Sequence, residues 1–230
     1  RGHKMATSGT TDFNLDLNLL VEEAFERCGG ELRTGYDLKT ATRSLNLLTI
    51  EWANRGVNLW TIEEDTVTLT SGTATYPLPS NTIDLVSQVI RTGSAGTQED
   101  ISISRMAVPT FASIPSKNSS GRPNQVYIDR KASIPTITLW PVPDNDSYTF
   151  VYWRLKRMED AGKGVNTQEI PFRFLPCLVA GLSYYLSLKI PGAGERTQFL
   201  KQDYEEQWML ASTEDREKAT LLIAPRQQFV

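Results

Sequence analysis

The segment DLKTATRSLNLLTIEWANRGVNLW, residues 37–60, holds the helix around which the rest of the chain is organised. Its apolar residues recur every three or four positions, at Leu38, Ala41, Leu45, Leu48 and Trp52. This spacing places them on one side of an α-helix. Asp37 is suited to cap the first turn, and Gly56 is suited to end the helix in a left-handed conformation. The pattern therefore predicts a core helix over residues 37–55.

A first helix is predicted from NLDLNLLVEEAFERCGG, with Asp12 or Asn14 as its N-cap and Gly29-Gly30 as its end. The short connection 31–36 predicts that the two helices form an antiparallel hairpin. Residues 1–13 are polar and lack the apolar core of a secretory signal, so we expect a disordered leader there.

Beyond Trp60 the apolar period changes from that of a helix to that of a strand. TVTLTSGTATYPLP predicts a β-hairpin that turns at Ser71-Gly72. Further strands are predicted over 84–92, 100–108, 124–130, 135–143 and 147–155, the last two joined by a turn at 144–146. Residues 109–123 are rich in Pro, Ser, Asn and Gly and predict a surface loop.

Helical periodicity returns in IPFRFLPCLVAGLSYYLSLKIPG, where Pro171 opens the helix, Pro176 is expected to kink it and Ile190-Pro191-Gly192 ends it. An amphipathic helix is predicted over 195–217. The predicted class is α+β. An antiparallel helical bundle comprises 14–60 and 168–217, an inserted β-rich domain, sandwich or barrel-like, covers 61–167, and a C-terminal extension covers 218–230.

Composition narrows the possible functions. A net charge of −3 and a pI near 5.4 argue against a dedicated nucleic-acid binder, which would present a basic patch. Two cysteines, Cys28 and Cys177, are too few for a disulfide framework or a zinc site, and Cys177 is expected to be buried. No apolar run is long enough to predict a membrane span.

The sequence offers no catalytic constellation, and we predict no enzyme, no cofactor and no metal. His3, in the polar leader, is the one histidine, so a triad has no base. Gly162-Lys163-Gly164 lacks the spacing of a phosphate-binding loop and is expected to be a solvated turn. The acidic pairs in Glu63-Glu64-Asp65 and Glu214-Asp215 are expected to form solvated edges or salt bridges rather than a metal site.

Two groups of motifs suggest a family. Asn54-Arg55-Gly56 ends the core helix, and a short link through Trp60 leads by Ile62-Glu63-Glu64 into the strand TVTLT. Near the other end, Ile170-Pro171-Phe172, Leu178-Val179-Ala180-Gly181 and Ile190-Pro191-Gly192 precede KQDYEEQW. In this layout the chain resembles the tail tubular protein A and head-to-tail adaptor family of short-tailed bacteriophages.

That resemblance implies a structural virion protein. It implies a homo-oligomeric ring, typically of twelve subunits, that is made in the host cytoplasm and sits at the portal vertex of the virion. Its implied partners are the portal protein, the tail nozzle protein and genomic DNA, which passes through the channel without sequence-specific binding.

Two sets of contact residues are hypothesised. Apolar residues follow a charged helix near the C-terminus, and we predict that they bind the portal together with a neighbouring cation: Leu221, Leu222, Ile223, Arg226 and Phe229. Subunit contacts are predicted for Trp52, Arg55, Trp60 and Trp208. For Trp52 and Trp60 the alternative is packing within the protomer, against helix and sheet.

The alternative function is a non-catalytic carbohydrate-binding or scaffolding module, in which Tyr148, Tyr152 and Trp153 offer an aromatic platform to a glycan. The segment YWRLKR, residues 152–157, could also suggest single-stranded nucleic acid, but its alternation is what a core strand shows.

Overall fold

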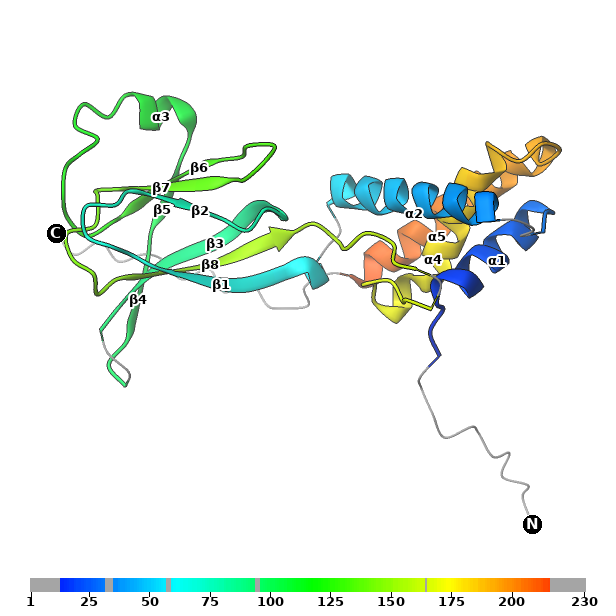
Figure 1. The fold of residues 1–230 in the computed structure, drawn as a ribbon, viewed down its shortest axis with the longest axis horizontal. Coiled ribbons are helices and arrows are strands. Elements are labelled where there is room, and N and C mark those ends of the chain that lie inside the picture. Colours follow the sequence, from blue (N-terminus) through cyan, green and yellow to red (C-terminus); the bar gives the residue numbers. More distant parts are fainter. Residues whose placement is uncertain (1–12, 32–34, 57–58, 94–95, 164, 216–230) are drawn as a thin grey trace, which may run out of the picture. The chain divides into compact units, whose positions relative to one another are not determined.

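The computed structural model describes residues 13–31, 35–56, 59–93, 96–163 and 165–215. These form two compact units (Figure 1). The helical unit is drawn from residues 1–57 and 159–230, and the β unit from residues 58–158. Both ends of the chain therefore contribute to the helical unit, and the predicted α+β class is confirmed.

Four long helices make the helical unit: α1 Leu17–Cys28, α2 Gly35–Arg55, α4 Leu175–Ser187 and α5 Gly194–Glu214. A 3-10 turn, η2 Phe172–Phe174, leads into α4, which contacts α1, α2 and α5. Residues on nearly every side of α4 are buried, as expected of a central helix. Gly181 lets α4 approach its neighbours closely, because an added Cβ would lie 2.9 Å from both Leu48 and Tyr204.

The predicted stripe of α2 is the buried side of that helix, with Ala41, Leu45, Leu48 and Trp52 all buried. The predicted cap of the first helix is wrong. Asp16, rather than Asp12 or Asn14, is the N-cap, and its Oδ1 accepts a hydrogen bond from the backbone N of Leu19 at 2.9 Å. Asp16 forms an isolated β-bridge with Thr167, which holds the backbone extended up to the first turn.

The β unit contains two four-stranded sheets. One has the order β1-β8-β3-β4, formed by Ile62–Thr68, Thr149–Lys156, Thr82–Thr92 and Glu99–Ser102. The other has the order β2-β7-β6-β5, formed by Thr75–Pro77, Thr136–Trp140, Gln125–Asp129 and Ser104–Met106. Of the two predicted forms, the β unit takes the sandwich: residues of both sheets share one apolar core, and the described strands form no closed barrel.

Both predicted hairpins are wrong in their pairing. The chain turns at Gly72, as expected, but β1 pairs with β8 and β2 pairs with β7 in the opposite sheet. Likewise β7 and β8 flank the turn at 144–146 and belong to different sheets. At both turns the chain crosses from one sheet to the other, and residues of both sheets fill the shared core.

The predicted strand 100–108 is also divided between the sheets. β4 pairs with β3, the buried Ile103 crosses over, and β5 runs parallel to β6. Within the predicted loop 109–123 lies most of a short helix, α3 Val108–Ala112. Its Phe111 stacks on Tyr127, with ring centroids 4.7 Å apart. The loop prediction is therefore wrong over this one turn.

Candidate functional site

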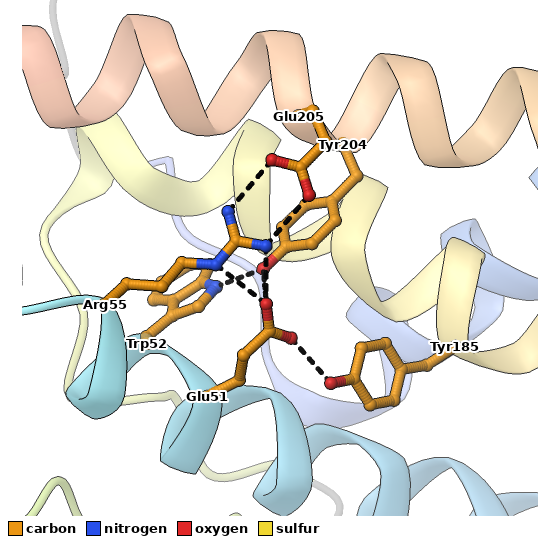
Figure 2. A network of polar contacts seen from close by, with 6 residues as sticks. All are labelled: Glu51, Trp52, Arg55, Tyr185, Tyr204 and Glu205. Carbon is orange, nitrogen blue, oxygen red and sulfur yellow. Dashed lines mark hydrogen bonds and ion pairs between the residues drawn. The ribbon is translucent and has the colours of Figure 1, made fainter.

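A polar network of the helical unit surrounds Arg55 at the C-terminal end of α2 (Figure 2). Its Nη1 and Nη2 donate to the two carboxylate oxygens of Glu205 on α5, at 3.0 and 2.9 Å. Its Nε donates to Glu51 Oε1, one helical turn earlier, at 2.7 Å. One guanidinium thus joins two carboxylates from two helices, the geometry in which Arg binds most specifically.

Glu51 also contacts the hydroxyl groups of two tyrosines on other helices. Tyr185 of α4 donates its hydroxyl to Glu51 Oε2 at 2.6 Å. Tyr204 of α5 lies 3.4 Å from Glu51 Oε1 and accepts a hydrogen bond from Trp52 Nε1 at 3.0 Å. The polar atoms of Trp52 and Tyr204, both fully enclosed by the unit, therefore satisfy each other.

Aromatic rings cover the network. The guanidinium carbon of Arg55 lies 4.8 Å from the ring centroid of Trp208 and 5.1 Å from that of Tyr204. Trp52 packs between Phe174 and Trp208, with centroid distances of 5.5 and 5.4 Å. Such rings attract a cation and shield it from water, which strengthens its bonds to the carboxylates.

The electrostatics follow from this arrangement. The hydrogen bond from Arg55 is the main cause of a lowered pKa of Glu205, and the bond to Glu205 in turn raises the pKa of Arg55. Burial, followed by the charge of Glu51, raises the pKa of Tyr204, while burial and the hydrogen bond to Glu51 raise that of Tyr185. The network holds helices together, because its hydrogen bonds join α2 to both α4 and α5.

Three of the four predicted subunit-contact residues, Trp52, Arg55 and Trp208, come together here. Trp52 packs inside its own unit, as the alternative reading expected, whereas Trp208 is half-buried. Trp60 lies in η1 Leu59–Thr61 of the β unit. Their role between subunits stays a prediction. The predicted portal-binding residues 221–229 lie outside the described residues.

Sequence reasoning missed the other polar residues of the network around Arg55. Glu51 could have been found, because it lies four residues before Arg55 on the same helix. Glu205, Tyr185 and Tyr204 could not, because nothing in the sequence links positions more than a hundred residues apart.

The acidic pairs form ion pairs where the structure describes them. In the β unit, Glu63 and Asp65 both face Arg154, which donates to Glu63 Oε2 at 2.7 Å. At the end of α5, the buried Asp215 pairs with Arg173. Within the described ranges, no three His, Cys, Asp or Glu side chains gather closely enough to hold a metal ion. None of the described helices is both long enough and apolar enough to cross a membrane.

The aromatic platform for a glycan does not form. Tyr152 is buried in the core of the sandwich, and its hydroxyl donates to Asp65 at 3.2 Å. Tyr148 packs against the same core. The two tyrosines therefore serve the interior of the β unit.

A family model described as the SU10 adaptor protein matches residues 19–225, which include nearly all of both units. The chain belongs to the SU10 adaptor family. This assignment supports the resemblance to phage head-to-tail adaptors found in the motifs around Arg55 and Pro171. Membership of the tail tubular protein A family stays a prediction. No curated protein matches this SU10 adaptor family member.

A solved chain from a structure titled as the neck of an empty GTA particle, computed with C6 symmetry, is also similar to this member of the SU10 adaptor family. It is 14% identical, and the match covers 81% of this chain and 87% of that chain with a TM-score of 0.23. So distant a similarity carries no argument about the site, which rests on the geometry above.

Proposed function

We propose that this protein is a ring-forming head-to-tail adaptor that connects the portal to the tail nozzle and forms part of the DNA channel. The observation that carries the proposal is the family match over residues 19–225, which takes in the helices from both ends of the chain and the β unit between them. We propose twelve copies per ring, a place at the portal vertex and a kinship with tail tubular protein A.

The proposed mechanism is geometric rather than catalytic. Helical units pack side by side around a channel, and DNA passes through it during ejection. The net charge of −3 fits this role, because a channel that conducts DNA must avoid a basic lining that grips phosphates. The Arg55 network gives each helical unit a fixed shape, which repeated packing around a ring requires.

The C-terminal extension is the proposed attachment to the portal. Its apolar residues Leu221, Leu222, Ile223 and Phe229, with Arg226, would insert into clefts of the portal. Deleting residues 220–230 should leave the circular dichroism spectrum and thermal unfolding unchanged and abolish binding to the portal protein of the same phage. A matched control replaces Arg216 and Lys218 by Gln, which keeps the apolar residues and should retain binding.

Negative-stain images of the intact chain mixed with portal should show an added ring beneath each portal. Portal particles without an added ring would reject the adaptor function. Rings that form equally well with the deleted chain would reject only the role of residues 220–230.

A further inference from the structure

The outer side of α2 carries cations and apolar groups together. Lys39, Arg43, Leu47 and Ile50, which we call the basic stripe, follow one another at helical spacing and are all exposed. They lie on the side of α2 opposite to Ala41, Leu45 and Leu48. Leu47 and Ile50 leave 50% and 42% of their surface in solvent.

The outer side of α5 carries the opposite charge. Glu195, Phe199, Glu206 and Leu210, which we call the acidic stripe, are exposed on the side opposite to Leu200, Tyr204 and Ala211. Phe199 and Leu210 leave 71% and 57% of their surface in solvent. Exposed apolar side chains rimmed by charges are typical of surfaces that bind protein.

None of the four charged residues in the two stripes has an ion-pair partner in the part of the chain that the structure describes. The stripes cannot satisfy each other within one copy, because α2 and α5 meet through their inner sides, at Arg55–Glu205 and Trp52–Tyr204. Both stripes are therefore accessible to another molecule.

We infer that the basic stripe of one copy binds the acidic stripe of the next copy. Arg43 would face Glu206 and Leu47 would pack beside Leu210, because the two residues of each stripe are separated by four positions on their own helix. Charge complementarity selects this pairing, because two basic stripes or two acidic stripes would repel each other. A contact between two different surfaces of identical chains repeats from copy to copy and closes into a ring when its rotation permits.

This inference rests on the proposed function and gives the ring its contact surface. It also explains why assembly would continue beyond a dimer. In a row of bound copies, the copy at one end keeps a free basic stripe and the copy at the other end keeps a free acidic stripe. Symmetric pairing through a single surface would end at two copies.

The test uses crosslinking between two different variants of the full chain. Copies carrying Leu47→Cys are mixed with copies carrying Leu210→Cys and treated with a flexible bismaleimide, both alone at high concentration and with portal present. The native Cys28 and Cys177 are buried and do not compete. We expect a crosslinked pair that contains one copy of each variant.

Three comparisons make the result specific. Lys201→Cys, on an exposed side of α5 away from the acidic stripe, should not crosslink to Leu47→Cys. Adding Arg43→Glu to the Leu47→Cys copy should lower the crosslinked fraction about tenfold, since it places like charges opposite each other. Adding Glu206→Arg to the other copy should restore it. Arg43→Glu should not harm the fold, because it removes a positive neighbour of Lys189, whose pKa burial and Arg43 both lower.

The outcomes separate the inference from the proposed function. If the chain rings the portal but charge reversal has no effect, or if Leu47→Cys and Leu210→Cys crosslink to the portal and not to each other, the inference is wrong and the adaptor function stands. If the mixed crosslink and its rescue appear but no ring forms on the portal, the inference stands and the adaptor function is wrong. Absence of the mixed crosslink under both conditions overturns the inference.

Discussion

Arg55 and Glu205 form a bidentate ion pair across 150 residues of sequence, with N–O distances of 3.0 and 2.9 Å. The pair joins the last turn of α2 to the middle of α5 and so connects the two halves of the helical unit. Two rings and a second carboxylate, Glu51, hold the guanidinium in place.

Replacing Arg55 by Lys should lower the free energy of unfolding by about 1 kcal/mol, because an ammonium cannot bond both oxygens of Glu205 in parallel or stack on Trp208. Urea denaturation followed by tryptophan fluorescence measures the change. The control is Arg91→Lys, whose fork to Asp100 joins two adjacent strands of the β unit. Among the described residues, no aromatic ring stacks on Arg91. Arg91→Lys should change stability less, and equal losses would contradict the role given to Arg55.

The Arg55–Glu205 pair should also make the free energy of unfolding depend on pH in the acid range. Since the hydrogen bond from Arg55 lowers the pKa of Glu205, the stabilisation is fully present above the pKa of an unfolded Glu, about 4.3. It is lost as pH falls through the lower pKa of the folded state. Glu205→Gln should therefore flatten the acid side of the stability curve, measured by urea denaturation from pH 7 to 3. In an Arg55→Gln background the same change should have no further effect.

Gly181 should not tolerate a side chain. The Cβ of Gly181→Ala would lie 2.9 Å from Leu48 Cδ2 and from Tyr204 Cε2, so α4 would have to move away from both neighbours. We expect a loss of about 1–3 kcal/mol in the free energy of unfolding, measured by chemical denaturation. Gly194→Ala, at the start of α5, meets no atom within 4 Å and should be neutral or stabilising. Comparable losses at the two positions would exclude crowding as the cause.

The two thiols should be unreactive in the folded protein. Burial raises the pKa of Cys28 to about 11 and that of Cys177 to about 12, so almost no thiolate exists at pH 8. Ellman's reagent should label both only as the protein unfolds, and rapidly in urea. An added thiol at the exposed position 47 should react at once in the same assay. Fast labelling of two thiols in native protein would show that the interior of the helical unit is open.

The helices were predictable because their period reports burial directly. Of the five predicted positions, Ala41, Leu45, Leu48 and Trp52 are buried, and Leu38 in the first turns is half-buried. The start of α1 was less predictable, since Asp12, Asn14 and Asp16 are all good caps. The choice is made by a contact distant in sequence, because Leu17 N donates to Asn166 O at 2.9 Å.

The strands were predictable, but their partners were not. Alternation tells which residues face inward, and in a sandwich both sheets face the same interior. Tyr76 shows how the chain is directed from one sheet to the other: its ring enters the core, and its hydroxyl bonds the backbone of Thr70 and Thr73 at the corner. The sequence contains a tyrosine there, but no local signal distinguishes such a corner from a hairpin turn.

The candidate site was predictable only in part. Three predicted contact residues, Trp52, Arg55 and Trp208, do meet. Their polar partners lie on helices that are distant in sequence, and the charge difference between the outer sides of α2 and α5 becomes visible only once burial fixes which side is outer.

The strand pairing of β1 with β8 sets Ile62 directly opposite Leu155. Because residues paired across antiparallel strands lie only about 5 Å apart, the polypeptide enters and leaves the β unit at almost the same point. Because its two ends lie together, the β unit connects the helices before it to the helices after it as a short loop would. This insert could therefore be enlarged, shortened or exchanged without repacking the helices, so the two units can evolve separately.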